Sequence, residues 1–412
     1  MTPRSRRPAI LPGATLGDGW VLAVFAGLLS VASARWPRRR LHCLAEVDAR
    51  ATRQVFPTLA VGRNGRDNPG PPPMPIPPMT LPACSAPRLL LAPMEGMLDS
   101  RLREVITQVG TYDWCVTEFV RVTNQRLPSR CFMRAAPELG HGARTLAGTP
   151  VRVQLLGSDP GCLAANAAFL AGLKPAGIDL NFGCPAPQVN RHRGGAVLLN
   201  EPELLHSIAR EVSAAIAGRV PFTAKMRLGV SDTSKALEAA QSLAEGGAQL
   251  LVVHARTKAD GYRPPAYWEW VGRVAEAVQV PVVANGEIWT LQDYLRCRAQ
   301  SGRADVMLGR GALADPFLAQ RIRDHLAGAT LRPSSGDWPQ IVPLLMAYWQ
   351  AVRRELEPRH APGRLKQWLN LLQRNYLPAA ALFRQIRALA DASEIDAHLA
   401  AVVRDHAIAP PG

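Results

Sequence analysis

Polar residues and glycines recur along the middle of the sequence, each time at the end of a short apolar run. They are Pro93, Met94 and Glu95; Gln154; Asn181 and Cys184; Lys225 and Arg227; His254 and Arg256; Asn285, Gly286 and Glu287; and Gly309, Arg310 and Gly311. Singly, a lysine or histidine in such a place is as often structural as catalytic, and an isolated cysteine is usually a small buried apolar residue. Because successive runs all end in this way, we interpret these residues together as one site.

Cys184 has the most reactive side chain in this set. It stands between Gly183 and Pro185, where the backbone leaves room for a ligand. Its thiol could donate a proton, act as a nucleophile or bind a metal, but no cysteine or histidine partner stands nearby at ligand spacing, so we predict no metal. A thiol acid beside a flavin-type hydride donor would complete the reduction of a carbon–carbon double bond, because hydride adds to one carbon and a proton to the other.

Two glycine turns and a lysine suggest how a ligand would be held. Gly286 and the Gly309-Arg310-Gly311 turn follow the last two apolar runs. Backbone N–H groups of glycine turns, together with an arginine, bind phosphate in many barrels, and the alternative is two ordinary tight turns. Lys225 would place its charge against a carbonyl or a ring nitrogen.

The alternation of short apolar runs with longer helical stretches predicts the elements that position this site. We predict strands at residues 88–93, 114–119, 151–156, 177–181, 222–226, 249–254, 282–284 and 305–308. We predict helices between them at 99–109, 160–171, 202–217, 234–245, 268–277 and 291–298. Several strands are apolar without alternation, as expected when both faces are buried. Eight strand–helix units in about 240 residues favour a (β/α)8 TIM barrel at 86–327, in which all strand ends meet at one face.

The strand pattern stops after Asp315, and helical patterns follow. We predict helices at 338–355, 364–374, 378–390 and 394–406, joined to the barrel by a segment rich in glycine, proline and serine at 328–337. Apolar residues recur at helical spacing in the first two of these helices. The sequence therefore predicts a small all-α domain at 336–407.

Residues 1–83 differ in composition from the rest of the chain, with eleven arginines and 13 of the 36 prolines. Their basic start, the apolar run at 20–34 and Ala32-Ser33-Ala34 are the parts of a secretory signal. We favour the alternative, a disordered or spurious extension with the true start at Met74 or Met79. The seven cysteines form no C-x-x-C pair, which indicates reduced thiols and a cytoplasmic protein. The net charge of +15 permits an anionic partner such as nucleic acid, and the composition excludes a polytopic membrane protein.

Five segments occur in an order that resembles the tRNA-dihydrouridine synthases. They are Leu91-Ala92-Pro93-Met94-Glu95-Gly96, Asp179-Leu180-Asn181-Phe182-Gly183-Cys184-Pro185, Gly194-Gly195-Ala196, His254-Ala255-Arg256-Thr257 and Ala284-Asn285-Gly286-Glu287-Ile288. The segments 119–123, 288–289 and 364–369 look most like the bacterial subfamily C. The resemblance implies an FMN-dependent TIM barrel with a helical RNA-binding domain. Such an enzyme would act as a monomer and reduce uridine 16 in the D-loop of tRNA to 5,6-dihydrouridine with NADPH.

The resemblance also implies roles for individual residues. Pro93, Met94 and Glu95 would touch the flavin ring, and Gln154 and Lys225 would bond its polar edge. The residues that would hold the ribityl chain and phosphate are His254, Asn285, Gly286, Glu287, Gly309 and Arg310. Cys184 would protonate C5 of the uracil after hydride reaches C6, and Asn181 would hold the base.

Contacts to the tRNA would come from basic and polar residues of both domains. The candidates are Arg121, Asn181, Arg227, Tyr262, Arg364, Lys366 and Arg387, with Arg384 and the unexpectedly basic segment 188–193 as further candidates. Arg384 and Arg387 could instead form a solvated helix face. Two other functions fit parts of the pattern: an FMN barrel acting on a free pyrimidine, and a non-catalytic RNA-binding barrel.

Overall fold

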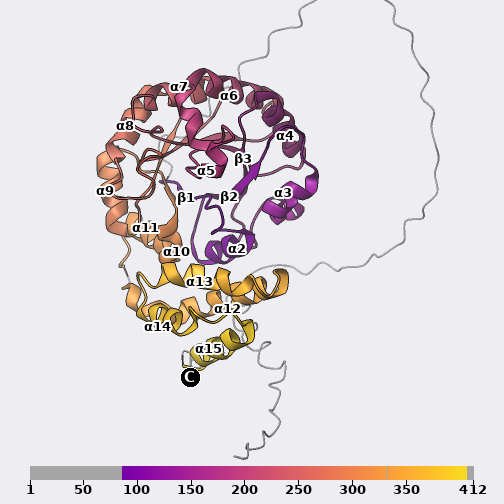
Figure 1. Cartoon of the computed structure of the whole chain (residues 1–412). Helices are drawn as coiled ribbons and strands as arrows, with labels where there is room; N and C mark the ends of the chain where they lie inside the picture. The colour runs from indigo at the N-terminus through magenta and orange to yellow at the C-terminus, as the bar shows by residue number, and fades with distance from the viewer. Residues whose placement is uncertain (1–85, 332, 406–412) are drawn as a thin grey trace, which may run out of the picture. The chain divides into compact units, whose positions relative to one another are not determined.

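The computed structural model describes residues 86–331 and 333–405, so the predicted N-terminal extension lies outside the described residues. Eight parallel strands close into a barrel in chain order, and β8 pairs with β1 (Figure 1). The strands are β1 Leu89–Leu91, β2 Trp114–Arg121, β3 Val151–Leu156, β4 Ile178–Phe182, β5 Phe222–Arg227, β6 Leu251–His254, β7 Val282–Asn285 and β8 Val306–Leu308. All eight predicted strands are present, and the predicted TIM barrel is confirmed.

Helices alternate with the strands, and most of them lie on the outside of the barrel, whereas α5 lies over its centre (Figure 1). They are α2 Ser100–Val109, α3 Ser129–Ala135, α4 Pro160–Gly172, α5 Pro187–Asn190, α6 Pro202–Ile216, α7 Ala236–Glu245, α8 Trp268–Ala277, α9 Leu291–Ser301, α10 Arg310–Ala314 and α11 Leu318–Leu326. The six predicted helices of this region are among them, with ends within three residues of the prediction. The short helices α3, α5 and α10 and the nine-residue α11 were not predicted, because so few turns leave little periodicity to detect.

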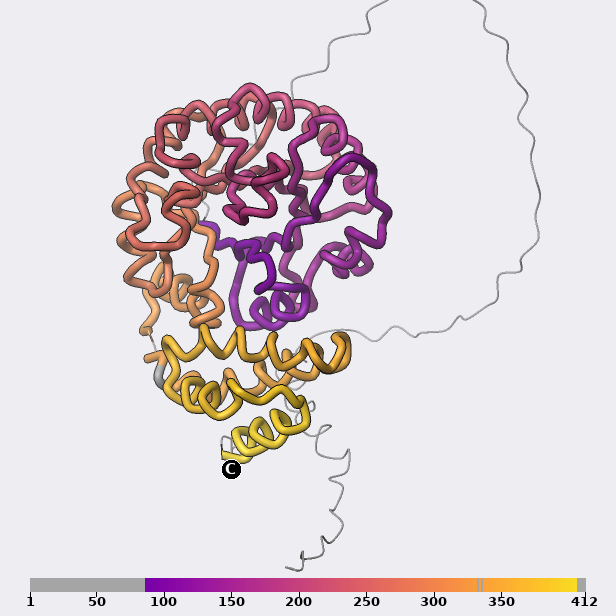
Figure 2. The backbone as a smooth tube through the Cα atoms, viewed as in Figure 1, coloured from indigo at the N-terminus to yellow at the C-terminus, as the bar shows by residue number. Residues whose placement is uncertain are grey.

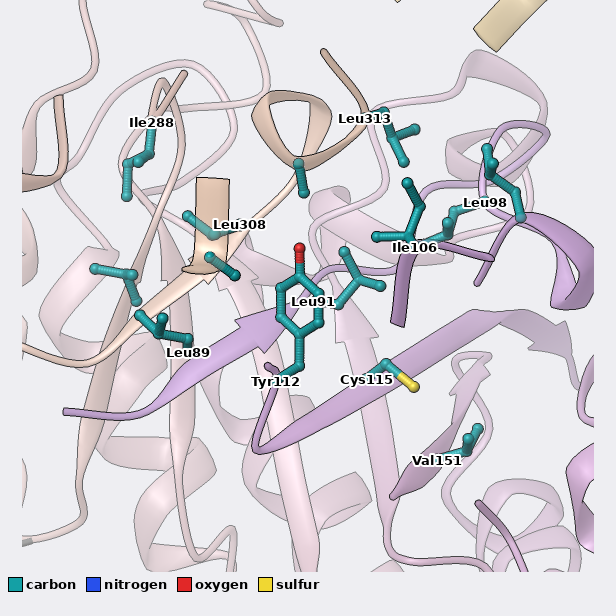
Figure 3. Packing of buried hydrophobic residues seen from close by; sticks show 14 of the residues in the cluster. Leu89, Leu91, Leu98, Ile106, Tyr112, Cys115, Val151, Ile288, Leu308 and Leu313 are labelled. Atoms are coloured by element: carbon teal, nitrogen blue, oxygen red, sulfur yellow. The ribbon is translucent and has the colours of Figure 1, made fainter. Parts of the chain in front are cut away.

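Two apolar clusters hold the barrel together, and strand alternation separates them. Leu90 of β1 packs inside the barrel with Trp114, Val116, Leu250, Val252, Val283 and Met307. Its neighbours Leu89 and Leu91 point outward into the cluster beneath the helices, which Figure 3 shows together with Ile106, Tyr112 and Cys115. Both faces of these strands are therefore largely buried, which explains why several of the runs are apolar without alternation.

Four helices follow the barrel: α12 Trp338–Glu355, α13 Ala361–Leu372, α14 Leu377–Ile386 and α15 Ala392–Asp405. They correspond to the four predicted C-terminal helices, with ends within four residues of the prediction. Tyr348 and Trp368 are buried between α12 and α13 with their rings edge to face, 5.3 Å apart. Within the described residues, no helix has the length and apolar character that crossing a membrane requires.

The junction between α13 and the barrel is made by specific polar contacts. The Trp368 indole donates to the carbonyl of Leu313 at 3.1 Å, and Arg364 donates to the carbonyl of Gly96 and to the Asp99 carboxylate, both at 2.6 Å. The backbone trace in Figure 2 follows α12 and α13 alongside α2 and α10, with which they make contacts. The C-terminal helices are thus attached to the side of the barrel that carries the first strand–helix loop.

We predict that Asp99 makes this junction sensitive to acid. Its carboxylate caps α2 at the Leu102 N–H and accepts from Arg101 and Arg364. Burial alone would raise the pKa of Asp99, but the hydrogen bond from Arg364, the Leu102 N–H and the two arginine charges together lower it. A lowered pKa in the folded state stabilises the protein above the ordinary value of 3.8 and ceases to do so as the pH falls through the folded-state pKa.

Asp99→Asn keeps a capping oxygen and loses the charge. It should lower the free energy of unfolding at pH 7 by about 1.5–3 kcal/mol, the usual worth of hydrogen bonds to a charged group. Urea unfolding at a series of pH values should show the difference from wild type shrinking below pH 3.8. Asp405→Asn, exposed at the end of α15, serves as the control and should change little at any pH.

Candidate active site

A cavity of about 850 Å³ opens at the carboxyl ends of the strands. Its lining includes these predicted site residues: Pro93, Met94, Glu95, Arg121, Gln154, Asn181, Cys184, Lys225, Arg227, His254, Tyr262, Asn285, Gly286, Glu287, Gly309, Arg310 and Gly311. Arg256, also predicted to belong to the site, does not line the cavity and instead donates to the Glu287 carboxylate. The unpredicted Phe119 of β2 adds to the lining. The structure therefore gathers one cavity from segments spread over more than half of the chain.

The predicted tRNA contacts of the helical region do not line this cavity. Arg364 donates to Gly96 and Asp99 as described, and the Lys366 ammonium donates to the carbonyl of Leu389. Arg387 is exposed on the surface after α14. Arg364 and Lys366 thus already donate hydrogen bonds within the protein. To contact RNA as predicted, each would have to share or give up these bonds.

The loop that carries Cys184 is held from two sides. The Asn181 side-chain oxygen accepts from the N–H groups of Gly183 and Cys184, both at 2.9 Å. The Cys184 carbonyl in turn accepts from the Asn190 amide at 3.0 Å and from the Ala196 N–H at 3.1 Å. Gly195 has a φ of +70°, and a Cβ there would lie 2.7 Å from the Cys184 carbonyl oxygen, so glycine is needed for this approach. The sulfur is therefore carried on a well-bonded turn.

The surroundings of Cys184 favour the protonated thiol. Burial raises the pKa of Cys184, and the Glu95 carboxylate adds to this shift. The N–H of Ala186 and the charges of Arg227 and Lys225 oppose it without reversing it. At neutral pH the group is a thiol, which can donate a proton, rather than a thiolate nucleophile.

Strand register places a polar network below this loop. Gln154, Asp179 and Thr223 lie opposite one another on β3, β4 and β5, and Asn181 lies opposite Lys225 one layer nearer the cavity. Asp179 accepts from Gln154 at 2.7 Å and from Thr223 at 2.6 Å. Burial and the neighbouring Arg227 lower the pKa of Lys225 to about 8, while the Asp179 charge opposes this fall. Lys225 therefore remains mostly charged at pH 7.

The part of the cavity around His254 combines several cations with the Glu287 carboxylate, which accepts from Arg256. Burial lowers the pKa of His254 well below its usual range, and the charges of Arg227, Lys225, Arg256 and Arg310 act in the same direction. The imidazole is thus neutral, and its buried Nε2 has no hydrogen-bond partner among the residues that the structure describes. A Cβ on Gly286 would lie 2.7 Å from the His254 ring, so glycine lets the turn after β7 approach the imidazole. Such a site favours an anionic group.

A carboxylate with an unusual pKa completes the lining. Burial and the nearby Glu118 charge raise the pKa of Glu95 to about 7. Glu118 accepts from the N–H of Gly96 at 2.6 Å, while Arg364 holds the Gly96 carbonyl. The loop after β1 is therefore fixed between β2 and α13.

Several residues that shape the site were not predicted. Asp179 and Thr223 lie inside the barrel, and Glu118 holds the first loop. Arg310 lies between the rings of Tyr262 and Trp289, with its guanidinium carbon 4.7 and 4.9 Å from their centroids. Asp179 could have been found, because a strand places residues two apart on the same face and Asp179 stands two before Asn181. The contact with Trp289 depends on loop conformation and leaves no sequence signal.

Comparison with known proteins identifies the family of this chain. The family described as "Dihydrouridine synthase (Dus)" matches residues 90–406. The chain belongs to the dihydrouridine synthase family. It is therefore an enzyme of that oxidoreductase family, as the resemblance implied.

Named relatives match over most of their length. The chain is 56% identical to the tRNA-dihydrouridine(16) synthase of Aquipseudomonas alcaligenes over 76% of this chain and 99% of that protein. It is 57% identical to the protein of the same name from Ralstonia nicotianae, over 75% and 94%. The corresponding protein from Pseudomonas putida is 55% identical, over 75% and 95%.

We predict that Glu95 controls the titration of Cys184. Glu95 is ionised above pH 7 and its charge raises the pKa of the thiol, so Glu95→Gln should shift the titration midpoint of Cys184 to lower pH. The rate of iodoacetamide alkylation of the Cys184 peptide, followed by mass spectrometry against pH, measures this midpoint. Glu104→Gln removes a half-buried carboxylate outside the cavity and should leave the midpoint unchanged. An unaltered midpoint in Glu95→Gln would show that the two groups are not coupled.

Proposed function

We propose that this enzyme reduces a uridine of tRNA, at position 16 in the D-loop, to 5,6-dihydrouridine, with FMN as cofactor and NADPH as reductant. The observation that carries the proposal is the protonated thiol of Cys184 at a cavity whose other side holds several cations and glycine turns. The names of the close relatives support the substrate and the position. A tRNA substrate also implies a cytoplasmic protein.

The donor set of the cavity fits a flavin mononucleotide. The unpartnered Nε2 of His254 and the cations around it would hold the ribityl chain and phosphate, with Arg310 and the turns at Gly286 and Gly309. Lys225 offers a charge and Gln154 an amide for the polar edge of the ring, and Pro93 and Met94 offer apolar contacts. When bound, the flavin would supply the hydride that adds to C6 of the uracil.

The residues of the chain supply the other half of the reaction. Cys184 gives its proton to C5, which requires the thiol form that burial maintains. Asn181 fixes the Cys184 loop and has a remaining amide hydrogen for a carbonyl of the base. Arg227 bonds the carbonyls of Gly183, Thr257 and Gly261, and so keeps the cavity wall in place beside Tyr262.

The target base has to leave the folded tRNA to enter this cavity. A uridine in a loop can be splayed out at small cost, and aromatic or planar groups then stack on it. Tyr262 is 53% exposed at the cavity and lies against the guanidinium of Arg227, 5.1 Å from the ring centroid. The exposed ring of Tyr262, backed by the buried Arg227, is thus available at the point where the base would enter.

The proton transfer is tested by Cys184→Ala. In cells that lack the endogenous enzyme, wild type should restore dihydrouridine at position 16, whereas the variant should restore it about 10²–10⁴-fold more slowly, the usual worth of a positioned general acid. Nuclease digestion and mass spectrometry of the tRNA locate the modified position. The purified variant should stay yellow and be reduced by NADPH at the wild-type rate. Unaltered dihydrouridine in the deletion strain, or oxidation of the reduced protein by free uracil rather than tRNA, would refute the proposed substrate.

The surface from β2 to α3 is the best candidate for contacts with the tRNA backbone. No acidic residue occurs between Glu118 and Glu138, and this interval contains Arg121, Arg126, Arg130 and Arg134. Arg121 lines the cavity, and the other three are exposed. None of the four has an acidic partner among the described residues, whereas Lys366 is bonded to Leu389. We therefore place the first phosphate contacts on this arginine strip, residues 121–134, with Arg384 and Arg387 as a second set.

This placement predicts a graded effect on RNA binding. Replacing Arg126, Arg130 and Arg134 together by glutamine should weaken tRNA binding and lower the slope of log K against log salt by roughly one for each lost phosphate contact. Lys366→Gln should change neither quantity much. Filter binding at several salt concentrations measures both. An unchanged slope in the triple variant would exclude the arginine strip, and a large loss in Lys366→Gln would restore the original assignment of that residue.

A further inference from the structure

A continuous chain of hydrogen bonds runs from the barrel interior to the Cys184 loop. The Asp179 carboxylate accepts from the Gln154 amide nitrogen at 2.7 Å. The Gln154 amide oxygen accepts from the Asn181 amide nitrogen at 2.7 Å. The Asn181 oxygen then accepts from the N–H groups of Gly183 and Cys184. Three side chains on two neighbouring strands thus connect a buried carboxylate to the turn that carries the thiol.

The direction of this chain is set at its buried end. An ionised carboxylate can only accept hydrogen bonds, so Gln154 has to turn its nitrogen toward Asp179. The Gln154 oxygen then faces Asn181, which has to donate from its side-chain nitrogen. The Asn181 oxygen is thereby left for the backbone N–H groups of the loop. Reversal of either amide would place oxygen against oxygen or nitrogen against N–H, and buried polar groups left unpaired are strongly unfavourable.

Asp179 has the environment that this role needs. It is almost fully buried, and it is also bonded by the Thr223 hydroxyl at 2.6 Å. Burial raises the pKa of Asp179 to about 6. The hydrogen bonds from Gln154 and Thr223 and the charges of Arg152 and Lys225 oppose this rise and keep it from going further. Arg152 lies over the Trp114 ring, 4.0 Å from its centroid, at the opposite end of the barrel from the cavity. The carboxylate is therefore mostly ionised at neutral pH.

We propose that Asp179 is a positioning residue that fixes the orientation of the Gln154 and Asn181 amides and thereby holds the Cys184 loop in its reactive conformation. The inference rests on the proposed function only in giving Cys184 the role of proton donor. Asp179 itself does not line the cavity. Its effect reaches the sulfur through two amides and the backbone of the loop.

Amide hydrogen exchange of the full-length protein as purified gives a direct readout. In Asp179→Leu the chain loses its acceptor, and exchange at the Gly183 and Cys184 amides should rise at least tenfold while the amides of β7 keep their wild-type rates. Gln154→Met breaks the chain at its middle, removes no charge and should give the same local rise. Thr223→Val removes the other bond to Asp179, outside the chain, and should leave the loop amides within threefold of wild type.

Asp179→Asn keeps the shape of the side chain and removes its acceptor-only character. Its amide can accept from or donate to Gln154, so it no longer fixes the direction of the chain, and exchange at the loop amides should lie between wild type and Asp179→Leu. In assays with tRNA, Asp179→Leu should have a lower kcat than wild type and an unchanged KM for tRNA. Loop exchange at the wild-type rate in Gln154→Met would overturn the proposal, and this variant decides the matter if Asp179→Leu does not fold. Exchange at the wild-type rate in Asp179→Asn would show that an acceptor-only carboxylate is not what fixes the chain, and would also overturn the proposal.

Failure here would be distinct from failure of the proposed function. Hydrogen exchange needs neither tRNA nor reductant, and the modification of uridine by wild type is assayed separately. Unchanged loop exchange with normal dihydrouridine formation would reject the role of Asp179 alone.

Discussion

Closure of eight parallel strands is the constraint on which the site depends. In a closed parallel barrel, every strand ends at the same face, and side chains from neighbouring strands form layers whose members are set by register. The register places Gln154 opposite Asp179 and Thr223 in one layer, and Asn181 opposite Lys225 in the next. A shift of one residue in any of these pairs would turn the polar side chains into the apolar layer under the helices. The chemistry of the cavity is therefore a consequence of strand pairing.

Burial favours the neutral form of Cys184 and of His254, and it therefore shifts their pKa values in opposite directions. It keeps the Cys184 thiol protonated, because the thiolate would be poorly solvated, and it keeps His254 neutral for the corresponding reason. Arg227 connects the surroundings of these two groups, since its guanidinium bonds the carbonyl of Gly183 and two carbonyls of the loop after β6. One side chain thus joins the Cys184 loop to the loop after β6.

The sequence was sufficient to predict the barrel and the set of residues at its mouth. Strand ends in a barrel share one face whatever the loops do, so Lys225 and His254 could be assigned to the cavity from pattern alone. Residues of the helical region were less predictable. Arg364 stands on a helix with the spacing of a surface residue, but its partner Asp99 lies 265 residues away in the chain. Strand alternation would have placed Asp179 on the same face as Asn181, but its partners Gln154 and Thr223 are set by register between strands and leave no sequence signal.

The contacts of Arg364 have a consequence for protein engineering. This side chain joins α13 to the carbonyl of Gly96, whose neighbour Glu95 lines the cavity, and to the residue that caps α2. The C-terminal helices are consequently not an interchangeable module. A chimera that took these helices from another member of the family would keep the first loop in place only if the donor supplied an arginine at the same position and reach.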